Sequence, residues 1–324
     1  MGEILRATFP CLSPSALKMD QFYAIGCRDL LLPNETTSIA YQNCVTLTRI
    51  GTYVGPLLGI FVLVCVFVTR FFFSPSILTG IYGKSFTSLS PRDQRQFRLH
   101  NTWPVLNLIA LPFIALPIFQ VVLGNREWSD SFFGNSAITF QDSAISSSTL
   151  VIALNAYELV YDENLRPLYV FHHVGSLLGL QGFAINALSM PLQGTEKMNQ
   201  YLKAADVCSF WIFFSCILGI LSRVVYILRR SSPHGGKRLT NVYRSAITIE
   251  GLTLTLEAMT VYYLLYINSD VLPSKPRNCI AVLQALFTMT KINTFRRLVD
   301  VYKKHVRRLS YAQRKSSTSE KGLL

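Results

Sequence analysis

Two adjacent histidines lie inside an apolar stretch, Leu168–Met190, and are the residues best suited to chemistry. An imidazole titrates near neutral pH, so His172 or His173 can take a proton from a substrate or attack a reactive carbonyl. Helical geometry puts His172, Ser176 and Asn186 close to one line along this stretch. Such a line indicates either a reactive site or a packing seam, in which small residues and hydrogen-bonded histidines let a neighbouring helix approach.

A carboxylate precedes the histidine pair by one helix. Glu158 lies in the apolar stretch Ser146–Val160, and the short turn 161–166 leads from it to the histidines. Helices joined by so short a turn lie side by side and antiparallel. Glu158 can therefore hold the tautomer of an imidazole, as the third member of a catalytic triad does. The alternative is a carboxylate at the level of the lipid headgroups.

Further ionisable residues fall within apolar stretches. A charge in lipid costs roughly 2.5–3.5 kcal/mol by insertion scales, so such groups should face a bundle interior or a cavity. Glu250 and Glu257 lie two turns apart on one helix face, whereas Asp206 opens its stretch and can also face solvent. We expect Arg223 and Lys291 to extend toward the headgroups. The side chains expected to line a cavity are Ser176, Asn186, Asp206, Glu250 and Glu257.

A metal site is the rival interpretation of paired histidines. Membrane di-iron enzymes draw six or more ligands from several histidine-rich clusters, but only His172 and His173 of the five histidines here lie in apolar stretches. Adjacent imidazoles on a helix also diverge by about 100°, which makes it hard for both to reach one ion. We therefore expect no metal site and no bound cofactor.

The elements that must position these residues are membrane-spanning helices. Half of the 324 residues are hydrophobic and 15% are charged, against about 25% charged in soluble domains. The apolar blocks are about 18 to 25 residues long, enough to cross ~30 Å of hydrocarbon, and they lack the alternation of strands. We predict an all-α, polytopic membrane bundle of about seven transmembrane helices. These are Thr52–Thr69, Thr102–Val122, Ser146–Val160, Leu168–Met190, Ala204–Leu228, Ala246–Ile267 and Asn278–Leu298.

Basic residues predict the orientation of the bundle. Lys and Arg concentrate in the loops 70–100 and 229–244 and after residue 296, and short cytosolic loops accumulate them. The N-terminus is therefore expected in the lumen and the C-terminus in the cytosol. Asn34 agrees, because its N-x-[ST] triplet is a glycosylation acceptor in the lumen. The net charge of +13 then reflects loops that face anionic headgroups and requires no nucleic acid.

Four cysteines fall on the lumenal side in this topology. A disulfide can form in that oxidising compartment, but the pairing cannot be deduced from the sequence. The residues concerned are Cys11, Cys27, Cys44 and Cys279.

The segment Ala156-Tyr-Glu-Leu159, followed by a turn and Phe171-His-His173, resembles the centre of the TLC domain. This membrane domain is shared by ceramide synthases, translocating-chain-associated membrane proteins and several lipid-regulating proteins. The charged segment 89–103 is similar to the lead into an earlier helix of that domain. The resemblance covers roughly residues 90–305. It divides the chain into a lumenal arm (1–47), a first helix with a cytosolic loop (48–89), the TLC-like domain (90–305) and a basic, disordered cytosolic tail (306–324).

In ceramide synthases the resemblance implies acyl transfer from acyl-coenzyme A to a sphingoid amine, with His172 or His173 as acyl acceptor or general base. Those enzymes carry a further His-Asp and an Asp downstream, whereas residues 193–206 here contain no histidine and only Asp206 matches. The resemblance thus favours a divergent lipid protein of the endoplasmic reticulum. Its partners would be membrane lipids, with acyl-coenzyme A as co-substrate if it is an enzyme, and it could form homo-oligomers. A seven-helix receptor or a transporter is the alternative.

Overall fold

The computed structural model of the protein describes residues 39–321, apart from residues 135 and 164 and the segments 190–194, 233–235 and 268–273. It describes the backbone but not the side chains of residues 39–51, 186–189, 195–199, 267, 275–276 and 312–321. Several predictions lie outside these limits: the glycosylation site at Asn34, the cavity-facing side chain of Asn186, and a disulfide that involves Cys11, Cys27 or Cys44. Cys279 is an exposed free cysteine.

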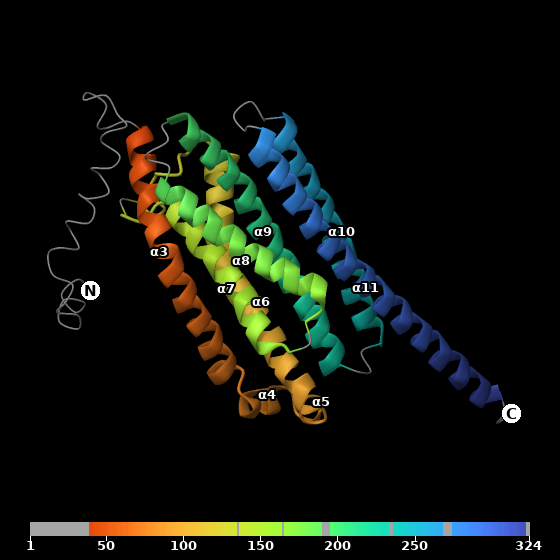
Figure 1. Ribbon diagram of the computed structural model, residues 1–324. Coiled ribbons are helices and arrows are strands. Elements are labelled where there is room, and N and C mark those ends of the chain that lie inside the picture. Colours follow the sequence, from red (N-terminus) through yellow and green to blue (C-terminus); the bar gives the residue numbers. More distant parts are fainter. Residues whose placement is uncertain are drawn as a thin grey trace.

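The described part of the chain is an all-α bundle, as predicted (Figure 1). Three of the helices continue into single π-helical turns, labelled η. In chain order the elements are α3 (Ile39–Phe67), η1 (Val68–Phe72), α4 (Pro75–Tyr82), α5 (Lys84–Thr87), α6 (Pro91–Pro117), η2 (Ile118–Val122), α7 (Phe140–Tyr161), α8 (Pro167–Ser189), α9 (Thr195–Ser231), α10 (Gly236–Tyr262), η4 (Tyr263–Ile267) and α11 (Ser274–Lys321).

Within the part of the chain that the structure describes, five helices are long and apolar enough to cross a membrane. Their candidate spans are Thr52–Phe72, Pro91–Val122, Phe140–Tyr161, Pro167–Ile185 and Gln200–Ser231. Within the residues described, the spans predicted in α10 and α11 are not among these five, so the count of seven and the orientation stay predictions. In α10 the inward face carries Glu250, Thr253 and Glu257 while the outward face is apolar, and the polar face lowers the average hydropathy of the helix.

The distribution of side chains is that of a protein whose solvent is lipid. Large apolar residues such as Leu63, Leu178 and Leu252 are exposed on the outer surface, whereas Thr102 and Asn107 are fully buried. In water this arrangement would expose apolar surface, but in hydrocarbon it costs nothing. The described chain is therefore a helical membrane protein.

The starts of α6 and α7 are set by local sequence. Ser90 accepts a hydrogen bond from the backbone N–H of Asp93 at 3.1 Å, and Pro91 follows at the first helical position. Thr139 and Asp142 form a capping box, with side-chain to backbone distances of 2.8 and 3.2 Å. These caps fix the residue at which each helix begins.

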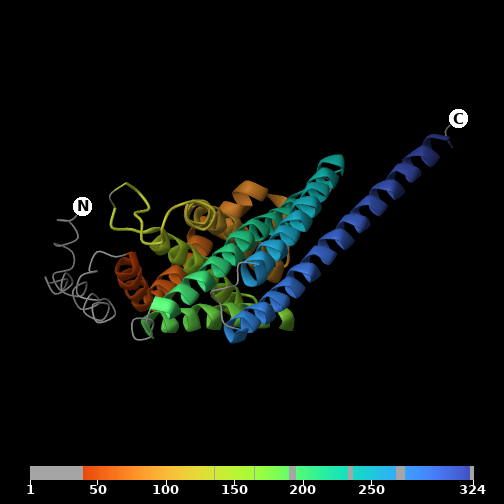
Figure 2. The ribbon, with the colours of Figure 1, turned by 90° about the horizontal axis from the view of Figure 1, so that it is seen from above.

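Helix α7 lies at the centre of the bundle, in contact with α3, α6, α8 and α9. Helix α6 also packs along α9, and α10 joins α11 to the bundle by packing against both α9 and α11. Helix α8 packs on α3 and α7 and touches α11 more sparsely. Figures 1 and 2 show α10 and α11 side by side at one edge of the bundle.

The two ends of the bundle are named by the elements that lie there. We call the end with α4 and α5 the α4 end, and the end where residues 123–139 connect η2 to α7 the loop end.

Helix α11 differs from its prediction. The sequence predicts a span that ends at Leu298 and a disordered tail from 306, but the helix is continuous to Lys321 and extends past the bundle (Figures 1 and 2). No Gly or Pro lies between Pro276 and Gly322 to interrupt it. At 1.5 Å per residue, its 48 residues reach about 72 Å, more than twice the hydrocarbon thickness.

Gly219 marks the close approach of α9 to α6. A Cβ atom at this position would lie 2.6 Å from Nδ2 of Asn107, whose side chain is fully buried. We predict that Gly219→Leu separates the two helices, because overpacking a buried contact costs about 1–3 kcal/mol or more. The expected result is a lower melting temperature of the detergent-purified protein. Gly59→Leu is the control, since nothing lies within 4 Å of a Cβ there; equal melting temperatures for the two variants would contradict the prediction.

Candidate functional site

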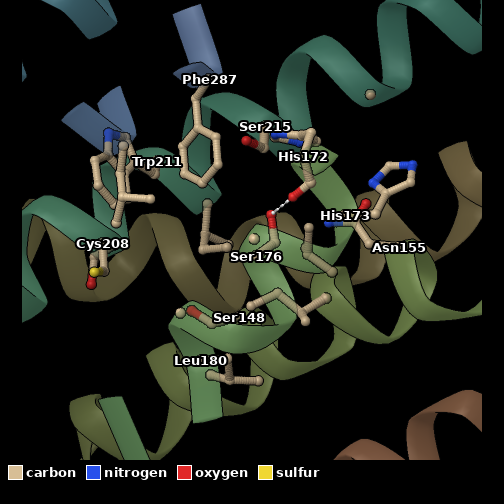
Figure 3. Close-up of a pocket in the computed structure, with 18 of the residues that line it drawn as sticks. Ser148, Asn155, His172, His173, Ser176, Leu180, Cys208, Trp211, Ser215 and Phe287 are labelled. Carbon is tan, nitrogen blue, oxygen red and sulfur yellow. Dashed lines mark hydrogen bonds between the residues drawn. The ribbon is translucent and has the colours of Figure 1, made fainter. Parts of the chain in front are cut away.

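A cavity of about 460 Å³ lies between α7, α8, α9 and α11. Its volume falls in the range of small-molecule sites, about 300–1,000 Å³. Figure 3 shows side chains from these helices directed into it. The polar and ionisable residues in its lining include Gln141, Ser148, Asn155, His172, His173, Ser176, Ser209, Arg223, Glu250 and Lys291, and the remainder of the lining is mainly apolar.

The histidine pair faces this cavity near the α4 end of α8. The His172 ring meets the edge of Phe287 on α11, with centroids 4.8 Å apart, and the Ser176 hydroxyl donates to the His172 carbonyl at 2.8 Å (Figure 3). Nδ1 of His172 and both ring nitrogens of His173 are buried without a hydrogen-bond partner among the described residues. Nδ1 of each histidine is thus available to a ligand, unlike the hydrogen-bonded histidines of a packing seam.

The glycines of α8 do not form a packing seam either. Gly175, Gly179 and Gly182 all line the cavity. A Cβ atom built on any of them would meet nothing within 4 Å. Close helix approach is the usual use of small residues in membrane helices. Here the missing side chains enlarge the cavity instead.

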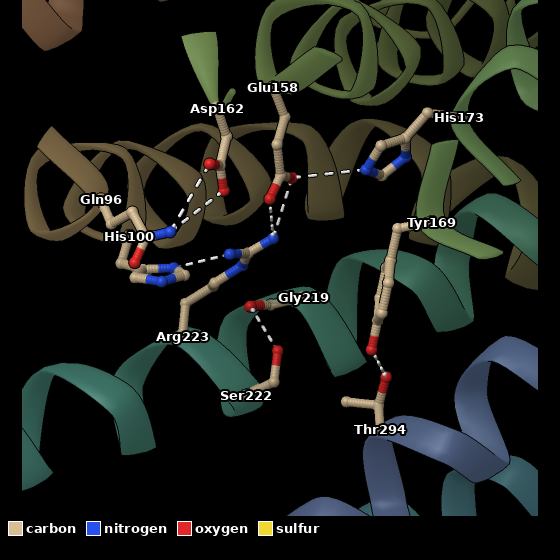
Figure 4. Close-up of polar contacts among 10 residues, drawn as sticks. All are labelled: Gln96, His100, Glu158, Asp162, Tyr169, His173, Gly219, Ser222, Arg223 and Thr294. Carbon is tan, nitrogen blue, oxygen red and sulfur yellow. Dashed lines mark hydrogen bonds and ion pairs between the residues drawn. The ribbon is translucent and has the colours of Figure 1, made fainter. Parts of the chain in front are cut away.

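Glu158 lies behind the histidines and is paired with Arg223. Arg223 Nη2 donates to both carboxylate oxygens of Glu158, at 2.8 and 2.9 Å, and Nη1 lies 2.6 Å from Nδ1 of His100 (Figure 4). The Glu158 carboxylate is 3.6 Å from Nε2 of His173, longer than a hydrogen bond. Glu158 therefore faces His173 rather than His172. The expectation that Arg223 extends to the headgroups is wrong, because a buried carboxylate on α7 holds it inside the bundle.

A second ion pair joins α10 to α11. Lys291 Nζ donates to both oxygens of the fully buried Glu257, at 2.7 and 2.6 Å. Gln284 extends this network, since its amide contacts both Glu257 and the indole N–H of Trp211. The expectation that Lys291 snorkels to the interface is therefore wrong as well.

The structure brings together some of the residues predicted to line a cavity and separates others. Ser176 and Glu250 line it, and Glu250, 4% exposed, has one carboxylate oxygen buried without a hydrogen-bond partner in the described chain. In the described part of the protein, Glu257 and Asp206 stand outside the lining. Glu257 is turned toward Lys291, and Asp206 accepts a hydrogen bond from the indole of Trp128 at 3.2 Å and lies 3.6 Å from Lys203.

Sequence analysis missed the inward role of Arg223 and the presence of Trp128 at the cavity. For Arg223 a signal existed, since it lies two turns before the end of an apolar helix, at the same end of the bundle as Glu158. Trp128 lies in a connecting segment and carries no such signal. Among the described residues, no group of three or more His, Cys, Asp or Glu side chains is placed to hold a metal ion.

The arrangement can bind a ligand that is largely apolar and carries polar atoms at one end. Unpaired imidazole and carboxylate atoms gather near the α4 end of the cavity, while the positive charges of Arg223 and Lys291 are already neutralised by glutamates. Comparisons with protein-family models, curated proteins and solved structures show no match for this chain. The function of the chain is therefore inferred from this site and its surroundings.

We predict that Arg223→Ala strongly destabilises the protein. The substitution leaves Glu158 buried and without its cation, which costs about 3–5 kcal/mol. The measurement is thermal or denaturant unfolding of the purified protein in detergent.

The control for this substitution is Arg95→Ala, which breaks the exposed ion pair with Glu163 (2.9 Å) and should cost less than about 1 kcal/mol. Adding Glu158→Gln to the Arg223 variant should restore part of the stability. Equal losses at Arg95 and Arg223 would show that the buried pair has no special weight.

Proposed function

We propose that this chain is a TLC-type lipid protein that binds one amphipathic lipid within the bundle and acts in lipid metabolism or membrane lipid homeostasis. The observation that carries the proposal is the place where the cavity meets the outer surface. Leu178 and Gly179 of α8 both line the cavity and are exposed, Leu178 at 68%. The cavity therefore reaches the surface at these residues, which we call the α8 opening.

The α8 opening lies on the apolar face of the bundle. Leu178 is about 17 Å along α8 from Pro167, well inside a candidate membrane span. Leu283 and Phe287 of α11 line the cavity as well. Nearer the α4 end, α8 and α11 are joined by a hydrogen bond of 2.7 Å between the hydroxyls of Tyr169 and Thr294 (Figure 4). A ligand that enters through this opening comes from the hydrocarbon of the bilayer.

The polarity of the cavity favours an amphiphile over a simple hydrocarbon. His172, His173 and Glu250 present buried polar atoms that lack partners among the described residues. Such atoms cost about 1–3 kcal/mol each when unsatisfied, so a bound ligand that hydrogen-bonds to them gains affinity. The polar group of the lipid would lie at these residues, with its hydrocarbon chain along the apolar remainder of the lining.

Acyl transfer is a second candidate, favoured by the unpartnered imidazole nitrogens close to Glu158. In this reaction an amine attacks the thioester carbonyl of acyl-coenzyme A while His172 or His173 takes the amine proton. The new C–N bond forms, the C–S bond breaks, and the departing thiolate receives the proton. A receptor or transporter role would use the same cavity without a covalent step.

We expect Gly179→Leu to fill the α8 opening and abolish lipid binding by the folded protein. Replacing a helical glycine with leucine favours the helix by about 1 kcal/mol, and the new side chain meets no neighbour. The measurement is the amount of lipid per protein, extracted from the purified protein and quantified by mass spectrometry, with an expected loss of about tenfold, or 1.4 kcal/mol. Gly59→Leu on α3 is the matched control and should retain lipid. Equal lipid content in both variants would refute the proposed binding site.

Acyl transfer predicts a different result for His172→Ala and His173→Ala. Cells that express the wild-type protein should accumulate an N-acylated lipid, and one or both variants should lose it by about a hundredfold, the usual scale for a general base. Each variant should still fold, with a melting temperature close to that of the wild-type protein. A lipid profile that matches empty-vector cells already in the wild type would exclude acyl transfer and leave lipid binding intact.

A further inference from the structure

Trp128 closes the cavity at the loop end. It lies in the segment 123–139, between η2 and α7, yet its side chain is only 5% exposed. It lines the cavity beside Gln141 and Ala144 of α7 and Ala204 of α9. The histidine pair lies toward the opposite end of the same cavity.

Two contacts hold the indole in place. Its N–H donates to Oδ1 of Asp206 on α9 at 3.2 Å. The Trp128 carbonyl accepts a hydrogen bond from the backbone N–H of Gln141 at 3.1 Å, which ties the same residue to the first turn of α7. Trp128 is therefore fixed to both helices that form this end of the cavity.

The rest of the segment supports Trp128. The Phe132 N–H donates to the Ile138 carbonyl at 2.8 Å, and the Phe140 N–H donates to the Asp130 carbonyl at 3.0 Å. The Phe132 ring packs against Phe113 of α6 and Phe140 of α7, with centroid distances of 5.9 and 5.6 Å. A connecting segment held in this way forms a rigid end wall.

The distance between the two ends suits an extended chain. On α9 the lining runs from Ala204 to Arg223, nineteen residues or about 28 Å along the helix. At the far end Gln141 is 3% exposed, and its amide atoms have no hydrogen-bond partner among the described residues. An apolar chain that pressed against this amide would leave it unsatisfied at a cost of about 1–3 kcal/mol, so a chain should end before it.

We propose that Trp128 sets the maximum length of the hydrocarbon chain that the protein accepts. The inference rests on the proposed lipid binding and adds to it a residue that determines specificity. With the polar group of the lipid held near His172 and Glu250, the chain extends toward the loop end and its last carbons meet the indole ring. Longer chains are excluded because the ring is fixed and cannot yield.

The test uses the full-length protein in detergent and an equimolar mixture of saturated, even-numbered fatty acids from dodecanoic to hexacosanoic acid. Bound fatty acids are extracted after gel filtration and their chain lengths are measured by mass spectrometry. Trp128→Ala should shift the distribution to longer chains by about two to four carbons. An extended chain advances roughly 1.2 Å per single bond, so this shift corresponds to about 2.4–4.8 Å of cavity length freed by the loss of the indole. Phe133→Ala is the matched control, because Phe133 belongs to the same segment and is 57% exposed; its distribution should equal that of the wild type.

A second variant tests the inference in the opposite direction and does not depend on the folding of the first. Ala144 lies one turn further into the cavity than Gln141, so Ala144→Leu should shift the distribution to shorter chains. Opposite shifts in the two variants support the inference, and a shift in Ala144→Leu alone supports it if Trp128→Ala fails to fold. Unchanged distributions in folded variants overturn it while lipid binding stands. If the wild-type protein takes up no fatty acid, the chain lengths of the lipid that co-purifies with each variant are compared in the same way. A wild-type protein that retains neither fatty acid nor co-purified lipid overturns the proposed function.

Discussion

Hydrocarbon offers no partner to a charge, so each ionised side chain inside this bundle needs one from the protein itself. Arg223 supplies it to Glu158, and Lys291 supplies it to Glu257. Each pair also joins two helices, α7 to α9 and α10 to α11. Since α7, α9 and α11 form three walls of the cavity, the two pairs help to hold these walls in position.

Helix α8 forms the fourth wall and is held by different forces. It carries the histidines and three cavity-lining glycines, it packs on α3 and α7, and near the α4 end it shares the Tyr169–Thr294 hydrogen bond with α11. Among the described residues, α8 presents the unpaired imidazole nitrogens, while α7 and α10 add the amide of Gln141 and one carboxylate oxygen of Glu250. Because the other three walls are held by packing and ion pairs, the inner face of α8 can carry glycines and histidines in place of large packing side chains.

The helical class and five of the spans could be predicted, because long apolar blocks are local signals. The partners of the charged residues could not, since Arg223 is 65 residues from Glu158 and Lys291 is 34 residues from Glu257. A long basic side chain reaches either the interface or a buried carboxylate, and only the packed helices decide between them. The glycines of α8 show the same limit, because their spacing suits a seam or a cavity equally well.

The exposure of Leu178 and Gly179 at the cavity has a consequence for how the site is filled. A ligand that arrives there is drawn from the two-dimensional solution of the bilayer, in which concentration is a mole fraction among lipids. Occupancy would then follow the composition of the surrounding membrane, and a molecule dissolved in water would reach the site only after it had partitioned into the bilayer. Two membranes of different composition would thus set different occupancies for one and the same protein.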